Sequence, residues 1–321
     1  MTQTHADSRW DLHRGKRRRR HTGEALGRSA PLAVVVAVAA LAALPGEPRA
    51  LAAVAAVGRT IPQWAWMWLL AWSVWFACKW ATWWPLRHAP RRWTVHLAYV
   101  LCHPGMDAQP VLVHRRTAAL APAGDWLRAF AALHLGAAVV WGITPRLVSY
   151  QPMLAAWCVM IGVVLMLHFG IFALLTCYWR EHGFDVRPMM WRPVRSRSLA
   201  EFWGARWNRD FHRLAGQFIF NPMRPLLGAR LALLATFLAS GLVHDLVISL
   251  PARGGLGGPS VYFVIQGLGV LAERRLRRTA PLLLRRAWMV CILAAPLPLL
   301  FHAPFIERIV LPFAAAIGAV Q

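Results

Sequence analysis

Long apolar runs separated by short arginine-rich segments are the feature of this sequence that most limits its possible folds. Of the 321 residues, 58% are hydrophobic and only 15% are charged, whereas soluble domains have about 45–50% and about 25%. A water-soluble protein of this length could not bury so much apolar surface. The composition therefore argues against a soluble globular enzyme and indicates an all-α fold, a polytopic integral membrane helical bundle.

The apolar runs predict about eight transmembrane helices. A further apolar segment, residues 93–103, is too short to cross a bilayer and is expected to be re-entrant or interfacial. We expect a basic, disordered tail at residues 1–30 and one multi-pass membrane domain at residues 31–321. The tail and the run after it also fit a secretory signal, but the spans that follow favour an uncleaved first helix. The predicted spans lie at residues 31–45, within 50–84, and at 126–144, 152–178, 229–250, 260–272, 283–301 and 304–320.

Positive charge is concentrated between the apolar runs. The chain has 36 Lys and Arg against 13 Asp and Glu, a formal net charge of +23. A soluble domain this basic would suggest nucleic-acid binding, but short basic segments flanked by apolar runs are typical of cytoplasmic loops facing lipid headgroups. With both termini in the cytoplasm, eight spans place every basic segment on that side, and no nucleic-acid partner is expected. Abundant Ala and Arg suggest a GC-rich bacterial genome, and hence the bacterial cytoplasmic membrane.

The cysteines point to neither a disulfide framework nor a metal site. All five lie in or beside apolar segments, and none forms a CxxC motif. Small apolar packing residues are the simpler interpretation. We therefore expect no metal.

The longest basic segment, residues 179–228, contains nine Arg and four acidic residues. Ser198 and Glu201 form a capping-box pattern, which predicts that a helix begins near Leu199. Apolar residues then recur with a 3,4 spacing as far as Phe218, which predicts one basic amphipathic helix lying in the membrane interface. Asn208 falls inside this predicted helix. A surface anchor without chemistry is one interpretation of the pattern.

A second feature is the polar face of the predicted span at residues 229–250. Thr236, Ser240 and His244 are four residues apart and share one helix face, and Asp245 follows directly. An ionisable pair in an apolar span is costly, so it favours a functional site over simple packing. The other polar residues in apolar runs are expected to be structural or interfacial; these are Lys79, His96, His134, His168, Gln266 and His302.

Six blocks of the sequence resemble the wax-synthase-like branch of the membrane-bound O-acyltransferases. They occur in that family's order, cover roughly residues 60–320 and lie mainly in 180–313. The most specific part is FWGARWN followed by SGLVHDL about 30 residues later. HPGMD departs from the plant wax synthases, where Trp before Pro is more usual, so the acceptor stays open. The blocks are HPGMD (103–107), LHFGIF (167–172), RPMMWRPVRSRSLAEFWGARWNRDFHR (187–213), TFLASGLVHDL (236–246), VIQGLGVLAE (264–273) and PLLFHAPFIERIVLPF (298–313).

The resemblance implies a helical bundle with a tunnel, which transfers an acyl group from acyl-CoA to the hydroxyl of a lipophilic alcohol. The product would be a wax or sterol-type ester. That family's intramembrane histidine falls on His244 and its asparagine on Asn208. We expect five further residues to bind or shape the substrate site: Trp203, Arg206, Trp207, Ser240 and Asp245. Acyl-CoA would be a co-substrate, with no bound cofactor.

The residue chemistry fits such a reaction. A histidine with a pKa near its ordinary value of about 6.5 can remove a hydroxyl proton as the oxygen attacks. A thioester is already activated, so neither a metal nor a covalent enzyme intermediate is required. The amide of Asn208 can donate to the developing oxyanion or orient the hydroxyl. The chain has no GxSxG elbow, which argues against a serine nucleophile.

Two alternatives remain open from the sequence. One is acyl or acetyl transfer to the hydroxyl of a secondary metabolite or a glycan, which would use the same two residues with a different acceptor pocket. The other is a non-enzymatic transporter or lipid-binding scaffold in which His244 and Asp245 relay protons. This second alternative leaves the FWGARWN block unexplained, and the sequence has no internal repeat of the kind common in transporters.

Overall fold

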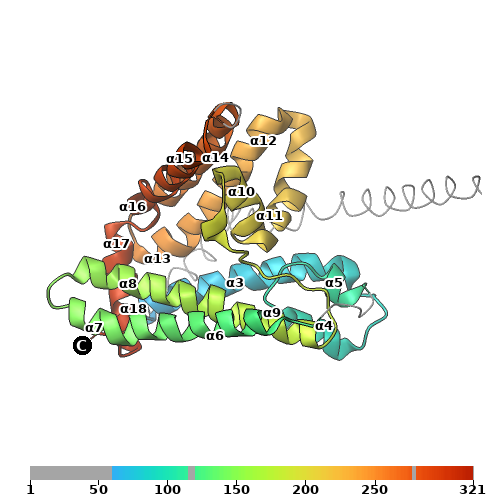
Figure 1. Cartoon of the computed structure of the whole chain (residues 1–321), viewed down its shortest axis with the longest axis horizontal. Helices are drawn as coiled ribbons and strands as arrows, with labels where there is room; N and C mark the ends of the chain where they lie inside the picture. Colours follow the sequence, from blue (N-terminus) through green and yellow to red (C-terminus); the bar gives the residue numbers. More distant parts are fainter. Residues whose placement is uncertain (1–59, 115–119, 277–279, 321) are drawn as a thin grey trace, which may run out of the picture. The chain divides into compact units, whose positions relative to one another are not determined.

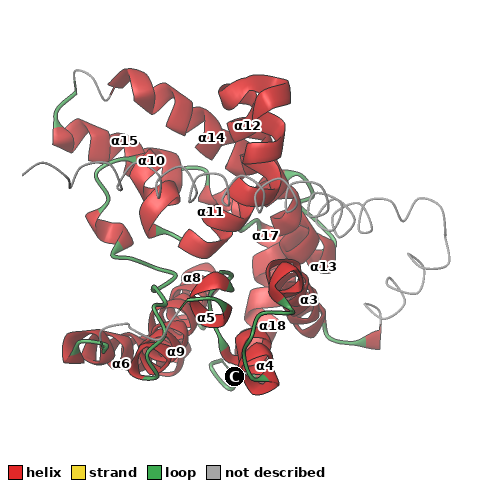
Figure 2. Cartoon of the chain, turned by 90° about the vertical axis from the view of Figure 1, so that its right-hand side faces the viewer, coloured by secondary structure: helices red, strands yellow, loops and turns green. Residues whose placement is uncertain are grey.

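The computed structural model describes residues 60–114, 120–276 and 280–320. All regular secondary structure in this part is helical, and no strand is present in it (Figures 1 and 2). The expected all-α class is therefore confirmed over the described ranges. The predicted basic tail and the first predicted span, residues 31–45, lie outside them.

Four stretches of helix among the described residues are long and apolar enough to cross a membrane. They coincide with the predicted spans at 126–144, 152–178, 229–250 and 283–301, whereas the count of eight is not confirmed. The stretches are Ala123–Leu147 (α6, Ala123–Ala137; η3, Ala138–Ile143; α7, Thr144–Leu147), Pro152–Glu181 (α8, Pro152–Val164; η4, Leu165–Ile171; α9, Phe172–Glu181), Arg209–Ala252 (α11, Arg209–Ala215; η7, Gly216–Phe220; α12, Asn221–His244; η8, Asp245–Ser249; α13, Leu250–Ala252) and Leu282–Leu300 (α15, Leu282–Ala294; α16, Leu297–Leu300).

The other predicted spans in the described part of the chain are also helical but are not among these four stretches. Residues 260–272 form part of one continuous helix, α14 (Gly258–Leu276), which contains the fully buried polar residues Gln266 and Glu273. Residues 303–316 form a shorter stretch of helix in three contiguous parts, α17, η9 and α18, with prolines in the first turns of α17 and α18. The short apolar segment at 93–103 forms a ten-residue helix, α4, and its re-entrant or interfacial position stays a prediction. The other elements are α3 (Gln63–Trp83), η2 (Trp84–Leu86), α4 (Trp93–Cys102), α5 (Gln109–Leu112), η5 (Pro193–Arg195), α10 (Leu199–Glu201), η6 (Phe202–Arg206), α17 (Ala303–Phe305), η9 (Ile306–Val310) and α18 (Leu311–Ala316).

Gly228 divides α12 into two helical parts. Its backbone has φ 74° and ψ 166°, a conformation that glycine adopts without steric cost but other residues avoid. The apolar helix that ends at His244 therefore begins at residue 229, where the sequence predicted the span to begin. Immediately after His244 the helix widens into the π-helical turn η8. Such turns are frequent at functional sites.

The helices α12 and α14 pack side by side (Figure 1). Their backbones approach closely at Gly241, where an added Cβ would lie 2.5 Å from the Cα of Ser260. A cluster of buried apolar side chains continues this contact through Ile248, Tyr262 and Phe263 to η9. This packing brings the end of the His244 helix against the beginning of α14.

The close crossing at Gly241 generates a stability prediction. Gly241→Ala places a methyl group against the backbone of α14 and forces the helices apart, which typically costs about 1–3 kcal/mol. We expect a lower thermal unfolding midpoint in detergent. The matched control is Gly142→Ala, because nothing lies within 4 Å of the position a Cβ would take there. Equal unfolding midpoints for Gly241→Ala and the wild type would contradict this packing.

Candidate active site

His244 is the last residue of α12, and its half-buried ring is fixed by a hydrogen bond. Its Nδ1 lies 2.7 Å from the backbone oxygen of Ser240. A backbone oxygen only accepts, so Nδ1 carries the proton of the neutral ring. The Nε2 atom is then unprotonated and has a lone pair to offer. The hydrogen bond to the Ser240 backbone therefore leaves Nε2 as the ring nitrogen that can accept a proton.

The structure brings Trp203 close to His244 through a shared aromatic neighbour. The ring of Phe263 on α14 lies 4.5 Å from the ring of His244 and 5.7 Å from that of Trp203. Trp203 also donates its Nε1–H to Gln266 at 3.3 Å. The two sequence blocks FWGARWN and SGLVHDL, far apart along the chain, therefore meet against one face of α14.

Asp245 and Ser240 are hydrogen-bonded within the protein. The buried carboxylate of Asp245 accepts from the Ser249 hydroxyl at 2.9 Å and from the Gly257 N–H at 2.8 Å. Its second oxygen accepts from the N–H and hydroxyl of Ser260 at 3.1 and 2.5 Å. The Ser240 hydroxyl donates to the backbone oxygen of Thr236 at 3.2 Å. Asp245 thus holds the beginning of α14 next to His244, and the substrate-binding roles of Asp245 and Ser240 stay predictions.

The prediction of one amphipathic helix over residues 199–218 is wrong. The helix begins at Leu199 as predicted, with the Ser198 hydroxyl accepting from the Glu201 N–H at 3.0 Å, but it ends at Arg206. Trp207 is extended and Asn208 is left-handed, with φ 44°. The cause is a neighbouring loop: the Arg209 N–H donates to the Met189 oxygen at 3.0 Å and the Trp191 N–H to the Arg206 oxygen at 2.8 Å. These tertiary bonds replace the continuing helical ones.

Asn208 lies at this break, directly before α11. Asparagine tolerates the left-handed conformation better than most residues. Its backbone N–H points to the sulfur of Met190 at 3.2 Å, while its side-chain oxygen is buried and has no hydrogen-bond partner among the described residues. A buried polar atom without a partner is costly. No hydrogen bond between Asn208 and His244 is present among the described residues.

A chain of aromatic contacts connects the two positions instead. Trp207 stacks on Phe202 with ring centroids 5.5 Å apart, and Phe202 meets the edge of Trp203 at 5.2 Å. Trp203 then contacts Phe263, which lies against His244. The predicted site residues Trp203 and Trp207 are therefore structural links between Asn208 and His244.

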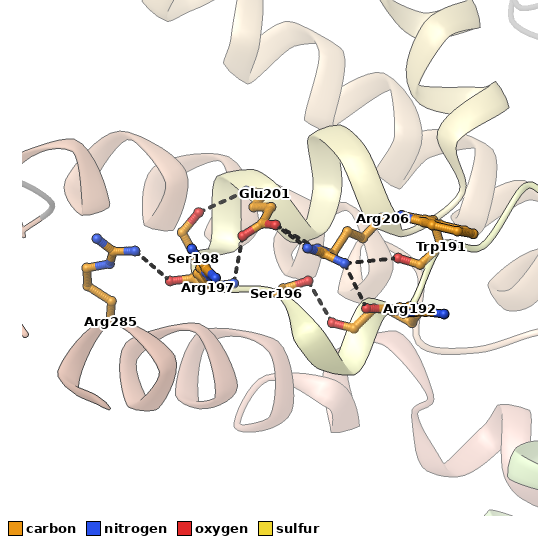
Figure 3. Close-up of polar contacts among 9 residues, drawn as sticks. Trp191, Arg192, Ser196, Arg197, Ser198, Glu201, Arg206 and Arg285 are labelled. Atoms are coloured by element: carbon orange, nitrogen blue, oxygen red, sulfur yellow. Dashed lines mark hydrogen bonds and ion pairs between the residues drawn. The ribbon is translucent and has the colours of Figure 1, made fainter. Parts of the chain in front are cut away.

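Arg206 holds the backbone of its own loop. Its Nε and Nη2 atoms lie 2.7 and 2.6 Å from one oxygen of Glu201. Its Nη1 donates to the backbone oxygens of Trp191 and Arg192 at 3.4 and 3.3 Å (Figure 3). The other Glu201 oxygen accepts from the Arg197 N–H at 2.8 Å. This guanidinium is already committed to protein groups.

A basic cavity of about 430 Å³ is lined in part by Arg209, the residue that follows Asn208 in the sequence. Arg209 contributes its guanidinium, which has neither a hydrogen bond nor an ion pair to a described residue. Arg213 also lines the cavity and pairs with Asp107 of the HPGMD block. The lining residues are Gly204, Ala205, Arg209, His212, Arg213, Gly216, Gln217 and Asn221. The charge and size suit an anionic group.

The HPGMD block packs against α11 through a buried polar cluster. The fully buried Lys79 donates to the Gly105 oxygen and lies 3.4 Å from His103 Nδ1. A Cβ at Gly105 would come within 3.0 Å of a carboxylate oxygen of Asp210. There is thus little room for a side chain at position 105, and the HPGMD block lies against the segment that carries Asn208.

Glu273 is the residue near the site that the sequence did not indicate. It belongs to a run of charges, ERRLRR, that reads simply as a cytoplasmic segment. In the structure its side chain is fully buried, and its two oxygens accept from the N–H groups of Leu199 and Ala200. Two signals were available: Glu273 is a single acidic residue ending an apolar run, and it is the last residue of the VIQGLGVLAE block. No group of three or more potential metal ligands occurs in residues 60–114, 120–276 and 280–320.

The Glu201–Arg206 pair generates a pH prediction. Burial opposes ionisation of Glu201, but the Arg197 N–H and the hydrogen bond and charge of Arg206 outweigh it and lower the pKa of Glu201. A lowered pKa contributes stability above the unfolded value of about 4.3, which is lost as the pH falls through the folded value. Glu201→Gln should therefore unfold a few degrees below the wild type at pH 7 in detergent, since such a pair is worth about 1 kcal/mol or less.

The difference between Glu201→Gln and the wild type should shrink as the pH falls below about 4.3. Glu307→Gln is the control, because Glu307 is exposed. A difference that stays constant down to pH 3.5 would show that the ion pair is not its source.

Comparison with known proteins places this site in a recognised segment. Residues 186–265 match the membrane bound O-acyl transferase family, and all seven predicted site residues lie within this match. The resemblance inferred from the sequence is thereby confirmed over this segment. No solved structure is significantly similar to the chain.

The curated relatives are plant proteins. Residues of this chain are 35% identical over 117 positions to "Probable long-chain-alcohol O-fatty-acyltransferase 9" of Arabidopsis thaliana, covering 34% of each chain. They are 30% identical over 107 positions to the protein named as number 7 of the same series, covering 30% of this chain and 32% of the relative. The matched region thus spans about a third of the length of these relatives.

Proposed function

We propose that this chain, which carries the membrane-bound O-acyltransferase pattern over residues 186–265, transfers an acyl group from acyl-CoA to the hydroxyl of a long-chain alcohol. The observation that carries the proposal is the free Nε2 of His244, held in an apolar helix against the same ring as Trp203. The matched plant proteins are named for alcohol O-fatty-acyl transfer, which supports this acceptor class. The product would be a wax-type ester.

The proposed reaction needs one base and one site for negative charge. His244 Nε2 takes the hydroxyl proton as the alcohol oxygen attacks the thioester carbon. The carbon–sulfur bond then breaks, and the departing thiolate takes the proton back from the imidazolium. Free CoA and an ester leave, and His244 returns to its starting form. Atoms and charge balance with no metal and no acyl-enzyme intermediate.

Asn208 is proposed to serve the substrate because its amide is held rigidly yet left uncommitted. The left-handed backbone fixes its position, and its side-chain oxygen has no partner among the described residues. The side-chain amide of asparagine carries an oxygen on one side and an NH₂ group on the other. Because no protein partner fixes the amide of Asn208, either group can face a ligand. Donation to the oxyanion or orientation of the hydroxyl are both compatible with this geometry.

The basic cavity lined by Arg209 is the proposed site for the CoA phosphates. Arginine binds phosphate bidentately, and the guanidinium of Arg209 lines the cavity without a described protein partner. Arg206 instead makes its hydrogen bonds to Glu201 and to the 191–192 loop, so we propose that it shapes the cytoplasmic entrance indirectly. The orientation that this requires has residues 179–228 and both termini on the cytoplasmic side, and we propose the bacterial cytoplasmic membrane as the location.

The activity itself is tested with the purified full chain in detergent or nanodiscs. Palmitoyl-CoA and a panel of alcohols from ethanol to hexadecanol and a sterol are supplied, and ester and free CoA are quantified. We expect one ester per CoA released, with long-chain alcohols preferred. Release of CoA without ester, or no turnover of any alcohol, would contradict the proposal.

The role of His244 gives a sharper prediction. His244→Ala and His244→Gln should both lower kcat by roughly 10²–10⁴-fold, because a positioned base contributes that much. Asn208→Ala should cost about 10²-fold. His134→Ala is the matched control, because exposed His134 makes the same contact four residues back along its helix, at 2.8 Å, outside the site. A folded His244→Gln protein with near-normal turnover would exclude the mechanism.

The donor site gives a separate prediction. Arg209→Ala should raise the KM for acyl-CoA about tenfold or more and change kcat little, since it removes binding common to ground and transition states. Arg206→Ala should mainly lower the unfolding midpoint, because it frees Glu201 and two loop carbonyls. Arg146→Ala, at an exposed arginine in α7, is the control. An unchanged KM for Arg209→Ala would remove this cavity from the donor site.

A further inference from the structure

The helix α14 touches both halves of the site along one stripe. Phe263, Gln266, Val270 and Glu273 follow a 3,4,3 spacing and therefore share one face. Phe263 contacts His244, Gln266 accepts from Trp203, and Val270 packs in one cluster with Leu199. From Phe263 to Glu273 the helix rises about 15 Å. One rigid element thus spans from the histidine to the beginning of the FWGARWN segment.

Glu273 is the far anchor of this stripe. It is 0% exposed, and its oxygens accept from Leu199 N–H at 2.8 Å and Ala200 N–H at 3.0 Å. Together with the Ser198 hydroxyl, which accepts from Glu201 N–H, it satisfies the first three amides of α10. A buried carboxylate is costly unless it is hydrogen-bonded. Moving the segment away from α14 would therefore leave a buried charge without its donors.

Asp245 is the near anchor. Next to His244 in sequence, it accepts four hydrogen bonds, three of them from the Gly257 N–H and from the N–H and hydroxyl of Ser260 at the beginning of α14. Ser249 supplies the fourth and lies 3.1 Å from His302 Nε2. The helix that carries His244 is thus attached to one end of α14, and the segment that leads to Asn208 is attached to the other.

We propose that α14 sets the separation between His244 and the 199–208 segment, with Glu273 as a positioning residue that acts through Leu199 and Ala200. The inference rests on the proposed acyl transfer for its kinetic consequence, while its structural part is independent of it. Glu273 touches no substrate. Its two hydrogen bonds fix where Trp203, and beyond it Asn208, stand relative to the base.

The test compares Glu273→Gln with the wild type in nanodiscs. Glutamine keeps the shape but presents an NH₂ group to one of the two backbone N–H donors, so one hydrogen bond is lost. We expect amide hydrogen exchange in the 197–206 segment to accelerate about tenfold, while exchange in α8 is unchanged. We also expect kcat to fall about tenfold or more, with the KM for acyl-CoA within twofold. Glu307→Gln, at an exposed glutamate, should change neither.

Ser198→Ala provides a second variant, should Glu273→Gln not accumulate, because it removes the acceptor of the next amide of the same helix start, the Glu201 N–H. Ser198→Ala should also accelerate amide exchange at 197–206 and lower kcat, with smaller changes in both than Glu273→Gln. Unchanged exchange at 197–206 in a folded variant would overturn the inference. So would faster exchange with unchanged kcat, or a loss of activity that only follows the folded fraction. A wild-type protein without ester formation would refute the proposed function, while the exchange measurement would still decide whether Glu273 fixes the segment.

Discussion

Buried polar groups in an apolar helix bundle must find hydrogen-bond partners, and in this protein those partners connect elements that are far apart in sequence. Glu273 caps the short helix α10, Gln266 receives the indole of Trp203, and Asp245 holds the beginning of α14. Each contact joins α14 to one of the two blocks that carry the candidate chemistry. Apolar packing alone is non-directional and would not specify this arrangement. Directional bonds to a few carboxylates and amides do.

The apolar pattern of the sequence predicted the elements whose cause is local. The beginning of α10 at Leu199 follows from the Ser198 cap, and the beginning of the apolar part of α12 after Gly228 follows from where the apolar run begins. The continuation of α10 could not be predicted, because backbone bonds from residues 189 and 191 interrupt it at Asn208. Those partners are tertiary, and the 3,4 spacing of apolar residues contains no trace of them. The same limit applies to α14, which an apolar pattern cannot distinguish from an ordinary span.

The candidate site was predictable in its residue types and less so in its connections. The spacing of Ser240 and His244 anticipated that they share a helix face, and the hydrogen bond between them defines which ring nitrogen is free. Arg206 was expected from the sequence to bind or shape the substrate site, yet its guanidinium is held by Glu201, an acidic neighbour five residues back. Glu273 looked like one charge in a basic loop because burial is a property of the folded chain. In both cases the sequence-based prediction failed because a charged side chain binds other groups of the protein instead of solvent or a ligand.

Three features are proposed to act together: His244 as the base, the uncommitted amide of Asn208 and the basic cavity lined by Arg209. The most direct measurement is a cryo-electron microscopy structure of the full chain in nanodiscs with a non-reactive thioether analogue of palmitoyl-CoA. The account predicts the phosphates of the analogue in the cavity at Arg209, with the carbon next to the sulfur between His244 Nε2 and the Asn208 amide. An analogue bound with its sulfur remote from both residues would contradict the account.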